Sequence, residues 1–122
     1  MENKLNFLVV CENAILADIS KNLSLINIFD VINTIGFPTM FPKFSVVFGL
    51  VCQNEGGHEA TLAFSKNGSG LVEIKIPFTG KSFRSIQNFA NFKFLEEGEY
   101  VFEIKLDNML LGSTSLFLKK SS

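Results

Sequence analysis

The chain has 122 residues, a formal net charge of −1 and a single arginine, Arg84, among its 11 basic residues. Proteins that bind nucleic acid usually carry a basic stripe rich in arginine, so this composition argues against nucleic acid as a partner. The 14 Phe, one Tyr and no Trp indicate a core of large rings that need no buried hydrogen-bond partner. A chain of this length can bury such a core by itself, so residues 1–122 are expected to form one domain.

The N-terminal apolar segment, residues 5–11, is predicted to be the first strand. It superficially resembles a signal peptide, but it is short, contains Asn6 and is followed directly by Glu12. No apolar run in the chain approaches the length of a membrane span. The two cysteines, Cys11 and Cys52, lie in strand-like segments without a metal-binding spacing, and both are expected to be buried free thiols. These features favour a cytoplasmic protein without a cofactor.

Short segments of alternating apolar and polar residues follow one another at the spacing of β-sandwiches. The only helix candidate, residues 14–19, is too short to be stable alone. We therefore predict an all-β fold, an antiparallel β-sandwich of about eight strands that is immunoglobulin-like or C2-like. Loops are expected at residues 36–42 and 80–84, and a turn at residues 20–22. The expected strands are residues 4–12, 23–31, 44–53, 58–65, 72–78, 85–95, 100–106 and a last strand through Leu116 and Leu118.

Two hairpins have the clearest signals in the sequence. The turn at residues 67–70 leads into a strand that alternates Val72, Ile74 and Ile76 with charged residues. The second hairpin reverses at Asp107-Asn108 near the end of the chain. In the strand 85–95, Ala90, Phe92 and Phe94 are expected to point inward, and residues 44–53 read as a central strand covered on both faces. The predicted core includes Phe48, Leu62, Ile74, Phe92, Phe102 and Ile104.

Three stretches resemble a family of small bacterial proteins whose domain has no known function. They are residues 21–32, the strand entry Gly57-His58-Glu59, and residues 91–104, which include the Glu97-Gly98-Glu99 turn. The resemblance spans most of the chain. Its motifs are mostly strand and turn positions, so it implies the sandwich fold and supplies no catalytic residue. The chain departs from the family pattern at the turns Lys21-Asn22 and Asp107-Asn108, where asparagine still tolerates positive φ.

The sequence contains no convincing catalytic constellation, so we expect no enzyme activity. Nucleophilic catalysis needs a base beside Ser or Cys, and the single histidine, His58, lies between glycine and strand residues where it is expected to cap the core edge or to be exposed. Gly80-Lys81-Ser82 is similar to the end of a phosphate-binding loop. The position of the first glycine is Lys75 and no helix follows, so this segment is predicted to be a turn.

Acidic residues offer two weaker candidates. Glu96, Glu97 and Glu99 crowd one turn, and carboxylates at the end of a sandwich can hold calcium. They lack the alternating Asp/Asn and Gly pattern of a dedicated loop, which favours a solvated turn. Asp30 ends an apolar strand, and we expect it to be a structural acid that ties down a neighbouring loop through backbone amides.

The segment 36–43 is the candidate interaction loop because it places Phe37, Met40 and Phe41 in a connection that should lie at the surface. Exposed apolar groups of this size often mark an interaction site. In the alternative reading, Phe37 and Phe41 fold inward and close the open end of the sandwich.

Two functions follow from these observations. The favoured hypothesis is a non-catalytic protein-interaction or assembly module, which binds another protein or self-associates as a homodimer through the Phe37–Phe41 segment or an uncovered strand edge. The alternative is a ligand-binding sandwich that recognises a carbohydrate or, with calcium, a lipid surface. Sugar-binding platforms usually use exposed Trp and Tyr, and this chain has no Trp and one Tyr. The sequence therefore favours the first hypothesis.

Overall fold

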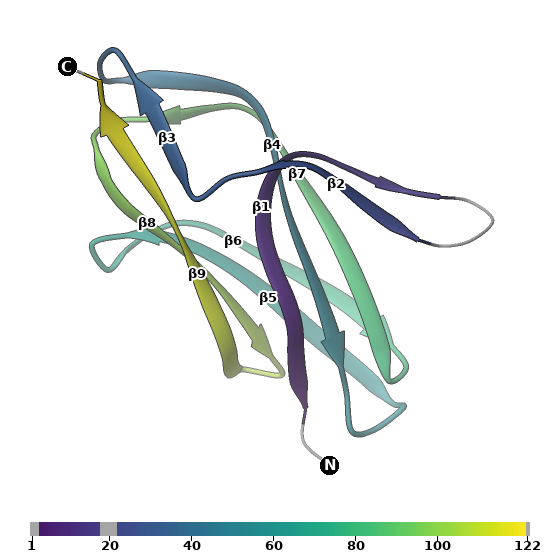
Figure 1. The fold of residues 1–122 in the computed structure, drawn as a ribbon. Coiled ribbons are helices and arrows are strands. Elements are labelled where there is room, and N and C mark those ends of the chain that lie inside the picture. Colours follow the sequence, from purple (N-terminus) through teal and green to yellow (C-terminus); the bar gives the residue numbers. More distant parts are fainter. Residues whose placement is uncertain (1–2, 18–21, 122) are drawn as a thin grey trace.

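The computed structural model describes residues 3–17 and 22–121, which form nine strands (Figure 1). The strands pair into two sheets, with the orders β2-β1-β4-β7 and β3-β9-β8-β5-β6. None of the described residues is helical, so none of them belongs to a helix that could cross a membrane. The strand bounds are β1 Lys4–Leu16, β2 Leu23–Ile28, β3 Val31–Thr34, β4 Thr39–Val51, β5 Gly57–Lys66, β6 Ser69–Thr79, β7 Ser82–Phe94, β8 Gly98–Leu106 and β9 Met109–Lys120.

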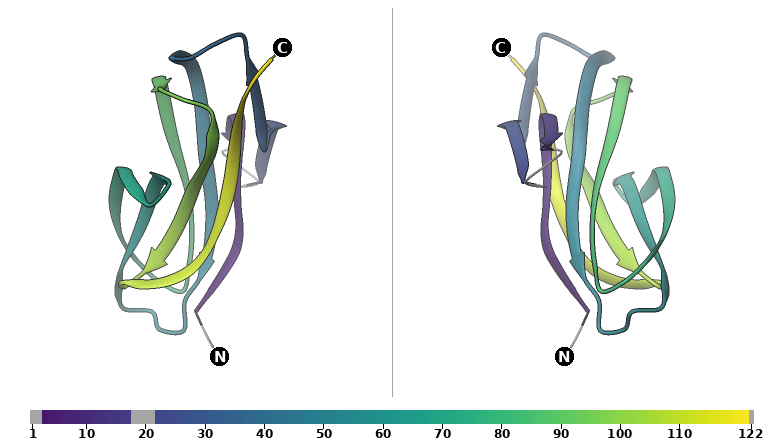
Figure 2. Two further views of the ribbon diagram at one scale, coloured as in Figure 1. Left: turned by 90° about the vertical axis from the view of Figure 1, so that its left-hand side faces the viewer. Right: turned by 90° about the vertical axis from the view of Figure 1, so that its right-hand side faces the viewer.

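The two sheets face each other and enclose a hydrophobic core (Figure 2). This arrangement confirms the predicted β-sandwich, with nine strands instead of about eight and with one parallel pair, β3 beside β9. Of the predicted core residues, Ile74 and Phe92 pack against the core but stay partly exposed, because β6 and β7 are the outermost strands of their sheets. The other four are completely buried: Phe48, Leu62, Phe102 and Ile104.

Strand β4 is the central strand that its sequence predicts. It lies between β1 and β7, and every residue from Phe44 to Leu50 is buried. The inner face of β4 packs against the opposite sheet, whereas on the outer face the ring of Phe7 lies over Gly49. Strand β8 is covered on one face only, so its buried residues alternate with partly exposed ones, as a period of two requires.

The predicted strand 23–31 is wrong as a single strand. Strand β2 ends at Ile28, and β3 begins at Val31 in the other sheet, where it runs parallel to β9. Two backbone hydrogen bonds hold this crossing: the Phe29 N–H donates to the Val10 carbonyl at 3.0 Å, and the Phe117 N–H donates to the Asp30 carbonyl at 2.7 Å. The crossing segment is therefore hydrogen-bonded to β1 in one sheet and to β9 in the other.

The bounds of both predicted loops and the direction of Ala90 also need correction. The loop predicted at residues 36–42 ends earlier, because β4 begins at Thr39 and pairs with β7 from there. The loop predicted at residues 80–84 is also shorter, because β7 begins at Ser82. Residues 14–16 of the helix candidate belong to β1, while residues 18 and 19 and most of the turn 20–22 lie outside the described residues. Ala90 points outward, since Asn91 has a φ of 53° and shifts the inward positions to Phe89 and Phe92.

Candidate functional site

Two of the three candidate residues of the predicted interaction loop pack against the core. Phe37 and Phe41 are partly buried and pack against the core, and the ring of Phe41 makes edge contacts with those of Phe29 and Phe44 at centroid distances of 5.6 and 6.1 Å. Met40 lies in β4 on the opposite face and is 57% exposed. The three residues therefore do not form one apolar surface.

The acidic candidates do not converge on one site. Lys66 forms an ion pair with Glu96 at 2.9 Å, Ser115 donates a hydrogen bond to Glu99, and the Lys120 N–H donates to Glu97 at 3.3 Å. No group of three or more His, Cys, Asp or Glu within residues 3–17 and 22–121 is placed to hold a metal ion. Asp30 is exposed, and the bond that joins it to β9 uses its backbone carbonyl.

Both cysteines are free thiols and both are buried. Burial is the main cause that raises the pKa of Cys11 and of Cys52, and the negative charge of Asp107 adds to the effect at Cys52. A raised thiol pKa lowers the fraction of reactive thiolate at neutral pH. The two side chains therefore act as small apolar core residues.

His58 forms a clasp between the start of β5 and the β8–β9 turn. Its Nδ1 lies 2.8 Å from Oδ2 of Asp107, and its Nε2 lies 2.8 Å from the carbonyl oxygen of Asn54. The second oxygen of Asp107 accepts the Glu59 N–H at 2.9 Å, and the His58 ring lies 5.3 Å from that of Phe78. Both ring nitrogens face acceptors, so the imidazolium form, with an N–H on each nitrogen, satisfies both bonds.

The clasp predicts that stability falls as the pH rises through neutrality. The hydrogen bond to Asp107 raises the pKa of His58 above its ordinary value, so its contribution is fully present below about pH 6.5 and is lost as the pH rises through the raised value. The same bond lowers the pKa of Asp107, whose contribution is lost only in acid, as the pH falls through the lowered value. We expect urea unfolding to give the greatest stability between about pH 4 and 6.5.

Asp107→Asn keeps the shape of the side chain but removes its charge, and it should flatten the pH dependence of the unfolding free energy between about pH 6 and 8. The chain contains one histidine, and the two buried thiols contribute a pH dependence only above about pH 8, so this range is selective for the clasp. An unchanged slope in the variant would show that the clasp does not stabilise the fold.

A different feature, which the sequence did not reveal, is a two-stranded ribbon at one corner of the sandwich. The pairing of β1 with β4 ends at Cys11 opposite Ser45, whereas its pairing with β2 runs from Cys11 to Leu16, which lies opposite Leu23. Residues 12–16 and β2 therefore leave the sheet together and project from the sandwich (Figure 1). We call this ribbon the arm.

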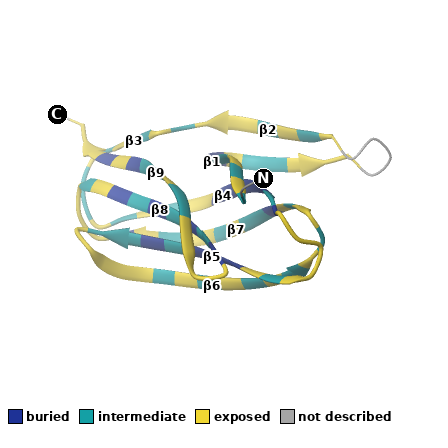
Figure 3. Ribbon diagram, turned by 90° about the horizontal axis from the view of Figure 1, so that it is seen from below, coloured by how far each residue is buried: buried dark blue, intermediate teal, exposed yellow. Residues whose placement is uncertain are grey.

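Large apolar side chains occupy both faces of the arm. By the strand register, Ile15 and Ile26 share one face, and they are 50% and 41% exposed. Ile28, which follows Asn27 with its φ of 53°, is 61% exposed. Leu16 and Leu25 share the other face, and Leu16 is 45% exposed. Figure 3 shows exposed and intermediate residues along β2. A two-stranded ribbon is marginally stable alone, so apolar residues on both of its faces favour a further covering layer.

The arm is nearly free of charge. Its single charged residue in the described ranges, Glu12, accepts a hydrogen bond from the side-chain amide of Asn27 at 3.1 Å. Strands at sheet edges usually carry lysine or proline that discourages pairing with other chains. Strand β2 carries neither, whereas the edge strand β6 carries both Lys75 and Pro77.

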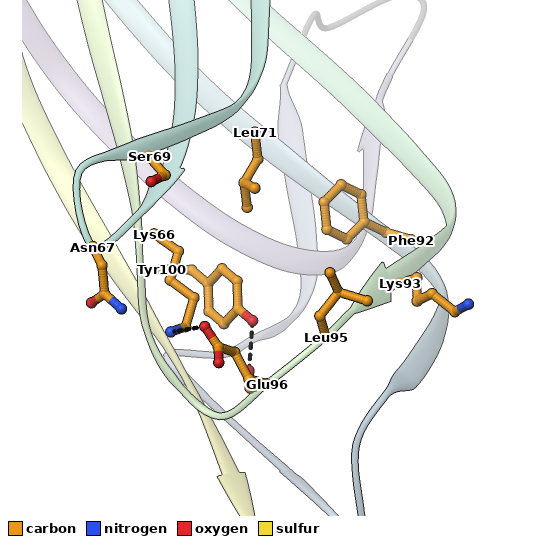
Figure 4. A pocket seen from close by; sticks show the side chains of 9 residues that line it. All are labelled: Lys66, Asn67, Ser69, Leu71, Phe92, Lys93, Leu95, Glu96 and Tyr100. Carbon is orange, nitrogen blue, oxygen red and sulfur yellow. Dashed lines mark hydrogen bonds and ion pairs between the residues drawn. The ribbon is translucent and has the colours of Figure 1, made fainter.

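A second uncovered surface is a cavity of about 220 Å³ between the start of β6 and the end of β7 (Figure 4). Leu71 from β6 and Phe92 from β7 face each other across it, with Leu95 beside Phe92. Leu71 and Leu95 are 47% and 67% exposed. The cavity therefore offers apolar walls that are open to solvent.

The polar groups at the floor of this cavity already have partners. The Tyr100 hydroxyl donates to the Glu96 carbonyl at 2.6 Å, and the Lys66 ammonium lies 5.7 Å from the centre of the Tyr100 ring while it pairs with the Glu96 carboxylate. Burial is the main cause that raises the pKa of Tyr100. These bonds fix the floor of the cavity and leave the apolar walls as its binding surface.

Comparison with solved structures shows an immunoglobulin-like fold. An immunoglobulin-like protein from Pseudomonas aeruginosa is similar over 98% of both chains, with a TM-score of 0.52 and 14% identity. The alkylpurine DNA glycosylase AlkC of Pseudomonas fluorescens, bound to DNA containing an abasic site analog, has a TM-score of 0.57 and 14% identity. That similarity covers 97% of this chain but only 30% of the glycosylase. At this identity the likeness concerns the fold alone.

Comparison with curated proteins finds no match. The model of a family described as a family of unknown function, DUF6941, matches residues 6–119. The match covers most of the strands and includes the three stretches on which the family resemblance rests. The chain therefore belongs to DUF6941, a family of unknown function.

Proposed function

We propose that this domain is a non-catalytic association module and that the arm binds a second copy of the chain. The observation that carries the proposal is the exposure of Ile15, Ile26 and Ile28 on a ribbon with which no third strand pairs among the described residues. Apolar surface gains about 25 cal/mol for each Å² that leaves water, and exposed apolar clusters often mark protein interfaces.

Self-association suits a surface that carries little charge. A two-fold contact, the commonest oligomeric arrangement, brings each surface against its own copy, so charged patches would repel one another. The one carboxylate of the arm, that of Glu12, is bonded to Asn27. An arm six residues long measures about 20 by 10 Å, and two arms that each bury both faces against the partner remove about 800 Å² of surface, the size of a small, transient interface.

The alternative functions have less support. Tyr100, the only tyrosine, is buried and offers no sugar-binding platform, and the carboxylates of Glu96, Glu97 and Glu99 have separate partners. AlkC is bound to DNA, but this chain has a net charge of −1 and one arginine. A cytoplasmic setting, where thiols stay reduced, belongs to the same proposal and agrees with two free cysteines.

Sedimentation equilibrium of the wild-type protein and of an Ile26→Thr, Ile28→Thr variant tests the proposal. Threonine keeps the β-branch that suits a strand but removes apolar surface. We expect the wild type to form a dimer and the variant to dissociate with a Kd at least about tenfold higher, because each dimer loses four buried apolar ends.

Ile35→Thr is the matched control, because Ile35 is 90% exposed and lies outside the arm. The control should dimerise like the wild type. A wild-type protein that stays monomeric at millimolar concentration, or a control that dissociates as readily as the arm variant, would contradict the proposal.

A further inference from the structure

The sandwich is open along one side, between the edge strands β6 and β7. The two strands are joined by residues 80 and 81, and next to this turn the rings of Phe78 and Phe83 stack at 4.3 Å and close the gap. Toward the other end, the tip of the β5–β6 hairpin stands apart from the end of β7 (Figure 2). Inward residues there, such as Val72 and Phe92, stay partly exposed, and the cavity of Figure 4 lies between Leu71 and Phe92.

Strand β7 has pairing capacity on this open side. It pairs with β4 along almost its full length, from Ser82 to Phe94, and no second strand among the described residues pairs with its other edge. An extended segment can add to such an edge through backbone hydrogen bonds, with alternate side chains pointing into the gap between the sheets. The cavity next to Phe92 and Leu71 is smaller than pockets for drug-sized ligands, about 300–1,000 Å³, and suits one large apolar side chain.

A lysine at the rim of the cavity predicts the charge of a second residue in an added strand. Lys66 is paired with Glu96, but Lys93 has no ion-pair partner within the described part of the chain. Figure 4 shows the Lys93 side chain directed away from the cavity, on the outer face of β7. In an added strand, the residue next to the one that enters the cavity points to this outer face, where a carboxylate would meet the ammonium group.

We propose that the open side binds an extended segment of a partner protein that joins β7, places a large apolar side chain in the cavity beside Phe92, and sets an adjacent acidic residue against Lys93. This site does not involve the arm. Its ligand class is therefore an acidic-apolar peptide strand, recognised by one side-chain cavity, one cation and a free strand edge.

Fluorescence anisotropy with a labelled peptide, acetyl-Thr-Val-Asp-Phe-Thr-Val-Thr-amide, tests the site. We expect saturable binding to the wild type and at least tenfold weaker binding when the Phe of the peptide is replaced by Ala. Lys93→Glu should weaken binding of this peptide about fivefold and should favour a peptide with Lys in place of Asp. The matched control is Lys119→Glu on β9, which should leave the affinity unchanged.

The arm variant Ile26→Thr, Ile28→Thr should bind the peptide like the wild type, so failure of the dimer and failure of this site are separate results. Absence of binding to the wild type at millimolar peptide would overturn the proposal. So would an equal loss of affinity in Lys93→Glu and Lys119→Glu, or a Lys93→Glu variant that does not prefer the Lys peptide.

Discussion

Phe64→Ala is expected to lower the free energy of unfolding by about 3–5 kcal/mol. Phe64 is completely buried on β5 and stacks on Phe102 at a centroid distance of 4.2 Å. Its ring also contacts those of Phe92, Phe94 and Tyr100, at 5.2, 6.3 and 5.8 Å. The alanine leaves a cavity among rigid rings that cannot collapse to fill it, so the transfer and cavity costs add. Urea unfolding followed by circular dichroism measures the loss.

Phe117→Ala is the matched control, because the Phe117 side chain on β9 is 38% exposed. It should lose less than half of the stability that Phe64→Ala loses. Equal losses would mean that the cluster around Phe64 is not the centre of the core.

Gly49→Ala is expected to destabilise the fold by about 1–3 kcal/mol, although alanine in a strand usually stabilises relative to glycine. A Cβ atom on Gly49 would lie 2.5 Å from Cε1 of Phe7, so the ring must shift from its place over Gly49. The double variant Phe7→Ala, Gly49→Ala isolates this contact. In the Phe7→Ala background, Gly49→Ala should cost nothing or should stabilise.

Equal costs of Gly49→Ala in the two backgrounds would show that Phe7 does not define the space at Gly49. Chemical denaturation of the four proteins in this cycle gives the coupling energy directly.

The sequence predicts which strands bury one face only and which strand buries both of its faces. Alternation identifies β6 and β8, and the continuous apolar run of β4 indicates its central position. These signals are local, because each residue's face follows from its neighbours along the strand. Of the predicted core residues, Ile74 and Phe92 are partly exposed, since local alternation does not tell which strand becomes the sheet edge.

Features that depend on distant contacts could not be predicted in this way. His58 finds its partner Asp107 49 residues later in the chain, and nothing in the local sequence pairs them. Asn91 has a φ of 53° within a strand and shifts the face on which Ala90 lies. The chain crosses between sheets at Phe29 and Asp30, and Phe29 continues the apolar residues of the strand before it, so the local sequence does not show where β2 ends.

The sequence does not reveal the arm. Ile15 and Leu16 fall within residues 14–19, the one helix candidate, and residues 23–31 are predicted to be an ordinary strand of the sandwich. Strand β2 does pair with β1, as a hairpin requires. The two strands extend beyond the last residue of β1 that pairs with β4, and this extension can be recognised only when the strand pairing is known.

Hydrogen exchange measured as a function of protein concentration tests the association of the arm most directly. If two copies cover each other's arms, the backbone amides of β2, Leu23–Ile28, should exchange more slowly as the protein is concentrated through the dimer Kd, while the amide of Ile35 should not change. Exchange rates in β2 that stay constant from micromolar to millimolar protein would contradict the association of the arm with a second copy.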